Sequence, residues 1–177
     1  MPAPCYNGTM PCHVLPINTS VLRNTHTVVS AYQSNRTAAE LIDAGRPTIA
    51  SYGNYYLSSG DSRDWQSRYT RDPCDEIDAA GACVNGTGAG GLLIGGTASA
   101  WGESVNAANF DAVVWHGLLA VAERLWSPKV EPRKIGDVVG GAAVRLEVMS
   151  CYLRTRYGVP VGALNPGYCP ADVRWLQ

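Results

Sequence analysis

The sequence of 177 residues lacks several features on which common functional classes depend. It has no excess of charge of either sign, since 14 Lys and Arg face 15 Asp and Glu, and this excludes the basic surface of a nucleic-acid-binding domain. No apolar run reaches the roughly 18 residues that a membrane-spanning helix needs. Residues 1–10 have neither the basic nor the apolar region of a signal peptide, so none is predicted there. We therefore expect a globular chain that binds neither nucleic acid nor a membrane.

Patterns for metal, nucleotide and nucleophilic sites are also missing. The three histidines, His13, His26 and His116, do not have the HxH or HExxH spacing of metal ligands, and no GxSxG nucleophile motif occurs. Residues 86–91 match GxGxxG, but they precede a predicted strand instead of following one, which is the wrong context for a dinucleotide site. We predict no metal and no cofactor.

Cysteine and glycosylation patterns are present, and they indicate an oxidising compartment. The six cysteines form no CxxC pair of the metal-binding type, and their close spacing suits short disulfide-bonded loops better than zinc. The expected couples are Cys5 with Cys12, Cys74 with Cys83, and Cys151 with Cys169. Four sequons predict N-glycosylation at Asn7, Asn18, Asn35 and Asn85. Together these features favour a lysosomal or secreted protein.

The regular structure is predicted to begin with a strand–helix–strand unit. The β-branched run 27–32 predicts a short buried strand. Thr37 and Glu40 have the spacing of a capping box and predict the start of a helix, which Gly45 ends. A second strand follows over 48–51. Because the connections are short, we expect a parallel pair of strands joined by a right-handed crossover.

The rest of the chain is predicted to add one strand and two long helices. Residues 58–91 are polar and glycine-rich and are expected to form a long connection, in which the acidic pair 75–76 is a solvated loop charge. A third strand over 92–98 is followed by helices over 111–126 and 142–157. The side chains expected to pack in the interior are Val114, Leu118, Val121, Ala122, Leu125, Val144, Val148, Cys151 and Tyr152, together with Trp65, Trp115 and Trp126.

Aromatic residues and one carboxylate follow the carboxyl ends of all three predicted strands. Tyr32 follows the first, Tyr55 and Tyr56 follow the second, and Trp101 and Glu103 follow the third. In α/β proteins with parallel strands, ligands bind just beyond the carboxyl ends of the strands. We therefore expect these side chains to form the rim of a pocket.

The strongest motif, IGGTASAWGE at 94–103 with AVAERLW at 120–126, resembles glycoside hydrolase family 20, the β-N-acetylhexosaminidases. Trp115 between the two runs and the terminal cysteines fit the same family, and the resemblance covers most of the chain from Thr27 onward. It implies an α/β fold in which this chain forms part of a TIM (β/α)8 barrel. Strands six to eight with their helices and a C-terminal helix would occupy 27–177, after an irregular segment over 1–26.

The resemblance also implies a role for each rim residue. Trp101 would form a wall of the pocket for the N-acetyl group of a terminal N-acetylhexosamine, and Tyr56 would donate to the acetamido carbonyl oxygen. Glu103 would accept from the O4 and O6 hydroxyls, and Tyr32 occupies the place of a second pocket aromatic. Enzymes of this kind are retaining and use substrate-assisted catalysis, in which the acetamido oxygen attacks the anomeric carbon.

The catalytic Asp-Glu pair of the family has no counterpart in this sequence, and the resemblance implies that it lies N-terminal to residue 1. We therefore expect no catalytic residue in this chain. Three strands cannot close a barrel, so we expect aggregation or a partner, either the missing barrel half or a second copy. Differences from the family at Tyr32, Ser58 and 116–117 leave two alternatives: a diverged, non-catalytic sugar-binding or scaffold protein of the secretory pathway, or a disulfide-rich structural module.

Overall fold

The computed structural model describes residues 27–32, 35–51, 57, 65–77, 79, 81–83, 91–127, 135–162, 164 and 169, with only the backbone of 135–140. The predicted irregular segment 1–26 lies outside these residues. So do the predicted Cys5–Cys12 couple and three of the four sequons, Asn7, Asn18 and Asn85.

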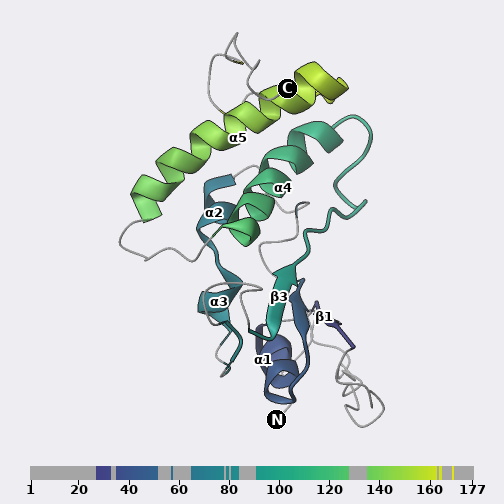
Figure 1. The fold of residues 1–177 in the computed structure, drawn as a ribbon. Coiled ribbons are helices and arrows are strands. Elements are labelled where there is room, and N and C mark those ends of the chain that lie inside the picture. The colour runs from purple at the N-terminus through teal and green to yellow at the C-terminus, as the bar shows by residue number, and fades with distance from the viewer. Residues whose placement is uncertain are drawn as a thin grey trace.

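The sheet consists of three short parallel strands in the order of the sequence (Figure 1). They are β1 (Val29–Ala31), β2 (Thr48–Ala50) and β3 (Leu93–Gly96). Both pairings, β1 with β2 and β2 with β3, are parallel. Helix α1 (Asn35–Asp43) connects the first two strands, so the predicted parallel strand–helix–strand unit is confirmed.

Helix α1 begins two residues earlier than predicted, and the glycine expected to end it lies just beyond its last residue. The backbone N–H of Arg36 donates to Oδ1 of Asn35 (2.9 Å), so Thr37 lies inside the helix and is not its cap. Gly45 follows the helix with φ +73°, a conformation that L side chains rarely adopt. The N–H of Gly45 donates to Ile42 O (2.8 Å) and the next N–H, of Arg46, to Leu41 O (2.9 Å).

One hydrophobic cluster lies between the sheet and α1. The strands contribute small side chains on the covered face, and α1 contributes its apolar side, which an amphipathic pattern predicts. The buried members of this cluster are Ala31, Ala38, Leu41, Ile42, Ala50, Ile77, Ala82, Leu93 and Val121. The opposite face of the sheet carries exposed side chains, Ser30 on β1 and Ile94 (41% exposed) on β3.

The connection between β2 and β3 contains two helices that the sequence reading missed. They are α2 (Trp65–Thr70) and α3 (Pro73–Glu76). The acidic pair 75–76 therefore lies in a helix, and Glu76 forms an ion pair with Arg71 (3.1 Å) instead of being a solvated loop charge. Both helices are short, so their hydrophobic periodicity is too brief to stand out from a polar, glycine-rich stretch.

The disulfides Cys74–Cys83 and Cys151–Cys169 have the predicted pairing, with Cα atoms 5.8 and 5.2 Å apart. The first joins α3 to the segment that precedes β3. In that segment, Leu92 N–H donates to Gly81 O and Leu93 N–H to Ala82 O, both at 2.9 Å. Gly91 passes so close to the Ala82 carbonyl that a Cβ atom would overlap it, which explains one glycine of the glycine-rich run.

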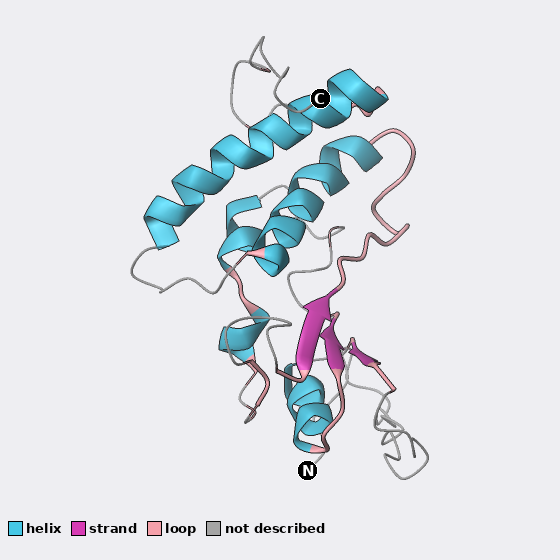
Figure 2. Ribbon diagram, viewed as in Figure 1, coloured by secondary structure: helices cyan, strands magenta, loops and turns pink. Residues whose placement is uncertain are grey.

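Two long helices, α4 (Phe110–Trp126) and α5 (Ile135–Tyr157), lie side by side and run in opposite directions (Figures 1 and 2). Helix α5 begins seven residues before the predicted start at residue 142. A second hydrophobic cluster joins these helices to α2, and its buried members are Trp65, Tyr69, Ala120, Ala142 and Leu146. No helix in the described part of the chain is long and apolar enough to cross a membrane.

The buried side of α4 differs from the predicted one. Val114 and Val121 are buried as expected, but Ala122 is exposed. The buried stripe is completed by Gly117 and Arg124, residue types that a count of apolar positions leaves out. Trp126 was predicted to pack and is 92% exposed, so that prediction is wrong: at the last position of α4, its side chain is covered by no described element.

The buried side of α5 also differs from expectation. Cys151 is buried, and Val148 and Tyr152 are half-buried, but Val144 is 65% exposed. Ala142, Leu146 and Ser150, spaced four residues apart, face the interior instead. The predicted face was displaced because the packing of α5 against α4 and α2, and not its own apolar count, selects the buried stripe.

Candidate functional site

The carboxyl ends of the three strands meet at one edge of the sheet. Ser51 N–H, just after β2, donates to Ala31 O at the end of β1 (2.9 Å). Thr97 N–H, just after β3, donates to Ala50 O at the end of β2 (2.9 Å). The predicted site segments therefore leave the sheet at the same edge, as expected for parallel strands.

The segments that follow β2 and β3 remain in contact beyond the sheet. Thr97 Oγ1 donates to Ser51 Oγ (2.6 Å), and Leu57 N–H donates to Ser99 O (2.7 Å). Leu57 is 1% exposed, so the chain is anchored at this point. Tyr56, which precedes Leu57, lies outside the described residues, as do Tyr55 and Ser58.

Three predicted site residues are described, and all three are exposed. Tyr32 is 57% exposed and Trp101 50%, and Glu103 is also exposed. Large aromatic side chains are usually well buried in an interior, so an exposed pair at the carboxyl edge of a parallel sheet is available to a ligand. The exposed carboxylate of Glu103, two residues after Trp101, can accept hydrogen bonds from hydroxyl groups.

Aromatic and polar contacts fix the first turns of α4. Trp115 Nε1–H donates to Asp111 Oδ1, one turn earlier, at 2.7 Å. The Phe110 ring meets the Trp115 ring edge to face, with centroids 6.4 Å apart and planes at 86°, a favoured aromatic geometry. Trp115 is half-buried, in agreement with a packing role.

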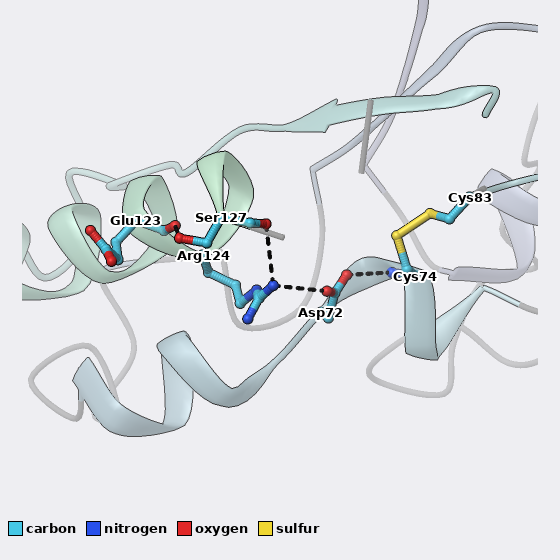
Figure 3. Close-up of polar contacts among 6 residues, drawn as sticks. All are labelled: Asp72, Cys74, Cys83, Glu123, Arg124 and Ser127. Atoms are coloured by element: carbon cyan, nitrogen blue, oxygen red, sulfur yellow. Dashed lines mark hydrogen bonds and ion pairs between the residues drawn. A yellow bond between two sulfur atoms is a disulfide. The ribbon is translucent and has the colours of Figure 1, made fainter. Parts of the chain in front are cut away.

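A buried ion pair joins α4 to the connection that carries the first disulfide (Figure 3). Arg124 Nη2 lies 3.5 Å from Asp72 Oδ2, with side chains only 3% and 8% exposed. Asp72 Oδ1 accepts from Cys74 N–H (2.9 Å) and caps α3. The Arg124 guanidinium also lies 5.8 Å from the centre of the Tyr69 ring, a cation–π distance. The arginine of the AERLW motif therefore has a structural role in this protein.

Two further polar contacts hold α5 and the segment after it. Arg145 Nη2 lies 2.6 Å from Glu123 Oε1 on α4, and the hydrogen bond to this carboxylate raises the pKa of Arg145. His116 Nε2 on α4 lies 2.8 Å from Gly162 O. On α5 itself, the hydroxyl contact with Tyr157 raises the pKa of Tyr152. The Arg145–Glu123 pair joins α5 to α4, and the His116 contact joins α4 to the segment after α5.

The described part of the chain contains no group of three or more His, Cys, Asp or Glu side chains that could hold a metal ion.

The sequence reading missed several polar contacts that the structure shows. Asp72 and Arg124 are 52 residues apart, and a buried ion pair over that separation leaves no local pattern. The side chain of Asn109 bonds two residues in the loop after Glu103, and no pattern in the sequence singles it out. An asparagine directly before a helix is usually a helix cap, so this residue type gives no local signal for a contact with the preceding loop.

Comparison with known proteins agrees with this arrangement. The family model for the catalytic domain of glycosyl hydrolase family 20 matches residues 13–129. The chain is 29% identical to beta-hexosaminidase subunit A1 of Dictyostelium discoideum over 163 residues, 88% of this chain and 28% of that protein. It is 35% identical to beta-hexosaminidase subunit beta of Felis catus over 139 residues, 76% of this chain and 23% of that protein. The corresponding subunit of Mus musculus is 34% identical over 146 residues, 81% of this chain and 25% of that protein.

The chain spans about a quarter of the length of the curated relatives it matches. The matched residues 13–129 include all three strands, helices α1 to α4 and the exposed Trp101 and Glu103. The chain therefore belongs to glycosyl hydrolase family 20.

Proposed function

We propose that this chain supplies part of the substrate site of a β-N-acetylhexosaminidase that removes terminal N-acetylglucosamine or N-acetylgalactosamine from glycans. The observation that carries this proposal is the exposure of Trp101 and Glu103 at the carboxyl edge of a parallel sheet, in a chain of this family. The catalytic Asp-Glu pair would come from polypeptide outside this chain, and no residue of this chain takes the role of acid or base.

The aromatic residues would hold the acetamido group in position to react. In substrate-assisted hydrolysis the acetamido oxygen must lie about 3–3.5 Å from the anomeric carbon, and such orientation contributes on the order of 7–11 kcal/mol. Trp101 would form one wall around the N-acetyl group and exclude water. Tyr32 would contribute on another side, and Tyr56 would donate its hydroxyl to the acetamido oxygen. The anchoring of Leu57 to Ser99 (2.7 Å) supports the approach of the Tyr56 segment to the Trp101 segment.

Glu103 would recognise the O4 and O6 hydroxyl groups of the terminal sugar. An ionised carboxylate accepts hydrogen bonds from hydroxyl groups that are about twice as strong as those between neutral groups. Two such bonds, to O4 and O6 of the terminal sugar, would be lost with an analogue that lacks these hydroxyls. This role requires Glu103 to be accessible, and it is exposed.

The three-stranded sheet would be part of a (β/α)8 barrel, as strands six to eight. Sequential parallel strands with α1 covering one face are the repeating arrangement of such barrels. On the other face, Val28 (46% exposed) and Ile94 (41%) face solvent, and this is the side that would face the barrel interior. The partner we propose is the remainder of the barrel, and a second copy of this chain is the competing possibility.

A lysosomal or extracellular location would complete this assignment. The two disulfides are expected in an oxidising compartment. Asn35 is an exposed sequon residue in the described part of the chain, so a glycan there would extend into solvent.

The test measures the binding of N-acetylglucosamine to the 177-residue chain by saturation-transfer NMR. We expect the largest transfer at the acetamido methyl group, and weaker binding by roughly tenfold or more in Glu103→Gln, since a hydrogen bond to a charged group contributes about 1.5–3 kcal/mol. Glu40→Gln on α1, another exposed glutamate, is the matched control and should bind like wild type.

Three outcomes separate the readings of this chain. Turnover of an aryl N-acetylglucosaminide by the chain alone would contradict the external position of the acid/base pair. Sugar binding without turnover, even after the remaining barrel is supplied, would indicate a non-catalytic sugar-binding protein. Absence of sugar binding under both conditions would indicate a structural or scaffold role.

A further inference from the structure

Asn109 occupies the position directly before α4 but does not cap the helix with its side chain. An asparagine at this position usually accepts a hydrogen bond from the second or third backbone N–H of the helix. Here Oδ1 accepts from Asn106 N–H (2.8 Å), and Nδ2 donates to Ser104 O (2.9 Å). Both polar atoms of the Asn109 side chain, Oδ1 and Nδ2, therefore bond to the loop that precedes the helix.

The bonded loop is the one that follows Trp101 and Glu103. Asn106 Oδ1 accepts from Ala108 N–H (2.8 Å), and Asn106 O accepts from the N–H groups of Asn109 (3.2 Å) and Phe110 (2.9 Å). Hydrogen bonds within the loop therefore connect its residues to one another. The bond from Asn109 to Ser104 lies next to Glu103 in the chain.

We infer that Asn109 is a positioning residue, which holds the Glu103 segment in a fixed relation to the start of α4. The inference rests on the proposed function in one respect, that Glu103 binds a sugar. A loop that is ordered before the ligand arrives loses less conformational entropy on binding. Both polar atoms of the Asn109 side chain bond to the loop, so helix α4 has no side-chain cap from this residue.

Two aspartate substitutions test the inference as a matched pair. Asn109→Asp keeps an oxygen for Asn106 N–H, but it removes the donor to Ser104 and places a carboxylate against that carbonyl. Asn106→Asp makes the same chemical change, yet within the described residues Asn106 bonds through Oδ1, which the substitution keeps. Both variants add one negative charge near the start of α4, where the helix dipole favours it, so this effect is common to the pair.

The first measurement is hydrogen–deuterium exchange over residues 101–110, with the strands β1 to β3 as an internal reference for global stability. In Asn109→Asp we expect exchange in the loop to be roughly three- to tenfold faster, the range that corresponds to the loss of one hydrogen bond. Exchange in the strands should not change, and Asn106→Asp should resemble wild type. Unchanged loop exchange in Asn109→Asp would overturn the inference.

The second measurement is the dissociation constant for N-acetylglucosamine, which we expect to rise by a similar factor in Asn109→Asp and to stay unchanged in Asn106→Asp. If the loop loosens but the affinity does not change, Asn109 has only a structural role, and the inference fails while the proposed function stands. If the wild-type chain binds no sugar, the proposed function fails, and the positioning of Glu103 for a sugar fails with it. The exchange experiment still decides whether Asn109 orders the loop.

Discussion

The buried ion pair between Asp72 and Arg124 gives the sharpest test of how this fold is held together. The pair connects α4 to the connection that contains α3 and the Cys74–Cys83 disulfide. We predict that Asp72→Asn strongly lowers the free energy of unfolding. The asparagine keeps an oxygen for Cys74 N–H, so the α3 cap is preserved and the change isolates the charge.

The magnitude follows from burial. Removing one partner of a buried pair leaves an uncompensated buried charge and costs about 3–5 kcal/mol, and Arg124 is only 3% exposed. The Tyr69 ring and the contact with Ser127 O (3.4 Å) remain and soften the loss, so we expect about 3 kcal/mol. Asp72→Ala also removes the cap and should cost about 1 kcal/mol more.

The control is the exposed ion pair Arg71–Glu76 in the same region. Its atoms are closer, 3.1 Å against 3.5 Å, but its side chains are 48% and 30% exposed. Exposed pairs contribute about 0–1 kcal/mol, so Glu76→Gln should have a small effect. Distance alone predicts the opposite order of the two variants, whereas burial predicts that Asp72→Asn is the more damaging.

The assay is urea unfolding followed by circular dichroism, with linear extrapolation to water. The double variant Asp72→Asn with Arg124→Met should recover most of the loss, because neither partner is then left as an unpaired buried charge. If Asp72→Asn costs no more than Glu76→Gln, or if the double variant is simply the sum of the two single variants, the reasoning from burial is refuted.

Two other predictions concern the disulfides and the tryptophans. Replacing both Cys151 and Cys169 by serine should destabilise the chain by about 3 kcal/mol in the chain-entropy model for a loop of this length, measured by the same unfolding assay, and an unchanged free energy of unfolding would contradict it. Trp65→Ala should cost about 3–5 kcal/mol because the side chain is 9% exposed and packs between helices. Trp126→Ala should change stability by no more than about 0.5 kcal/mol, since this side chain is 92% exposed, and a large loss would show that Trp126 is covered in solution.

Local patterns predicted the parts of the fold that depend on neighbouring residues. The strands β1 and β3 came from short apolar runs, and Gly45, at positive φ, ends α1 as predicted. The candidate site was also chosen by this reasoning, because ligand residues in parallel α/β proteins follow the carboxyl ends of strands, and its role in binding stays a prediction. The spacing of the cysteines was sufficient to predict two pairings.

Contacts between distant segments decided the rest. Helices α2 and α3 are too short for a periodic signal, and α2 is held by burial of Trp65 and Tyr69 against α4 and α5. The two tryptophans look alike in the sequence, yet Trp65 is buried and Trp126 is exposed, because burial depends on which element lies opposite.

The sequence by itself determined where the three strands, the helix α4 and two disulfides form, since hydrophobic period, glycine and cysteine spacing act over a few residues. Only the tertiary structure decided that Arg124 is an internal ion-pair partner and that Asn109 binds a loop instead of capping its helix. A polar side chain takes the partner that folding brings within hydrogen-bonding distance, and that partner is set by the packing of the whole chain.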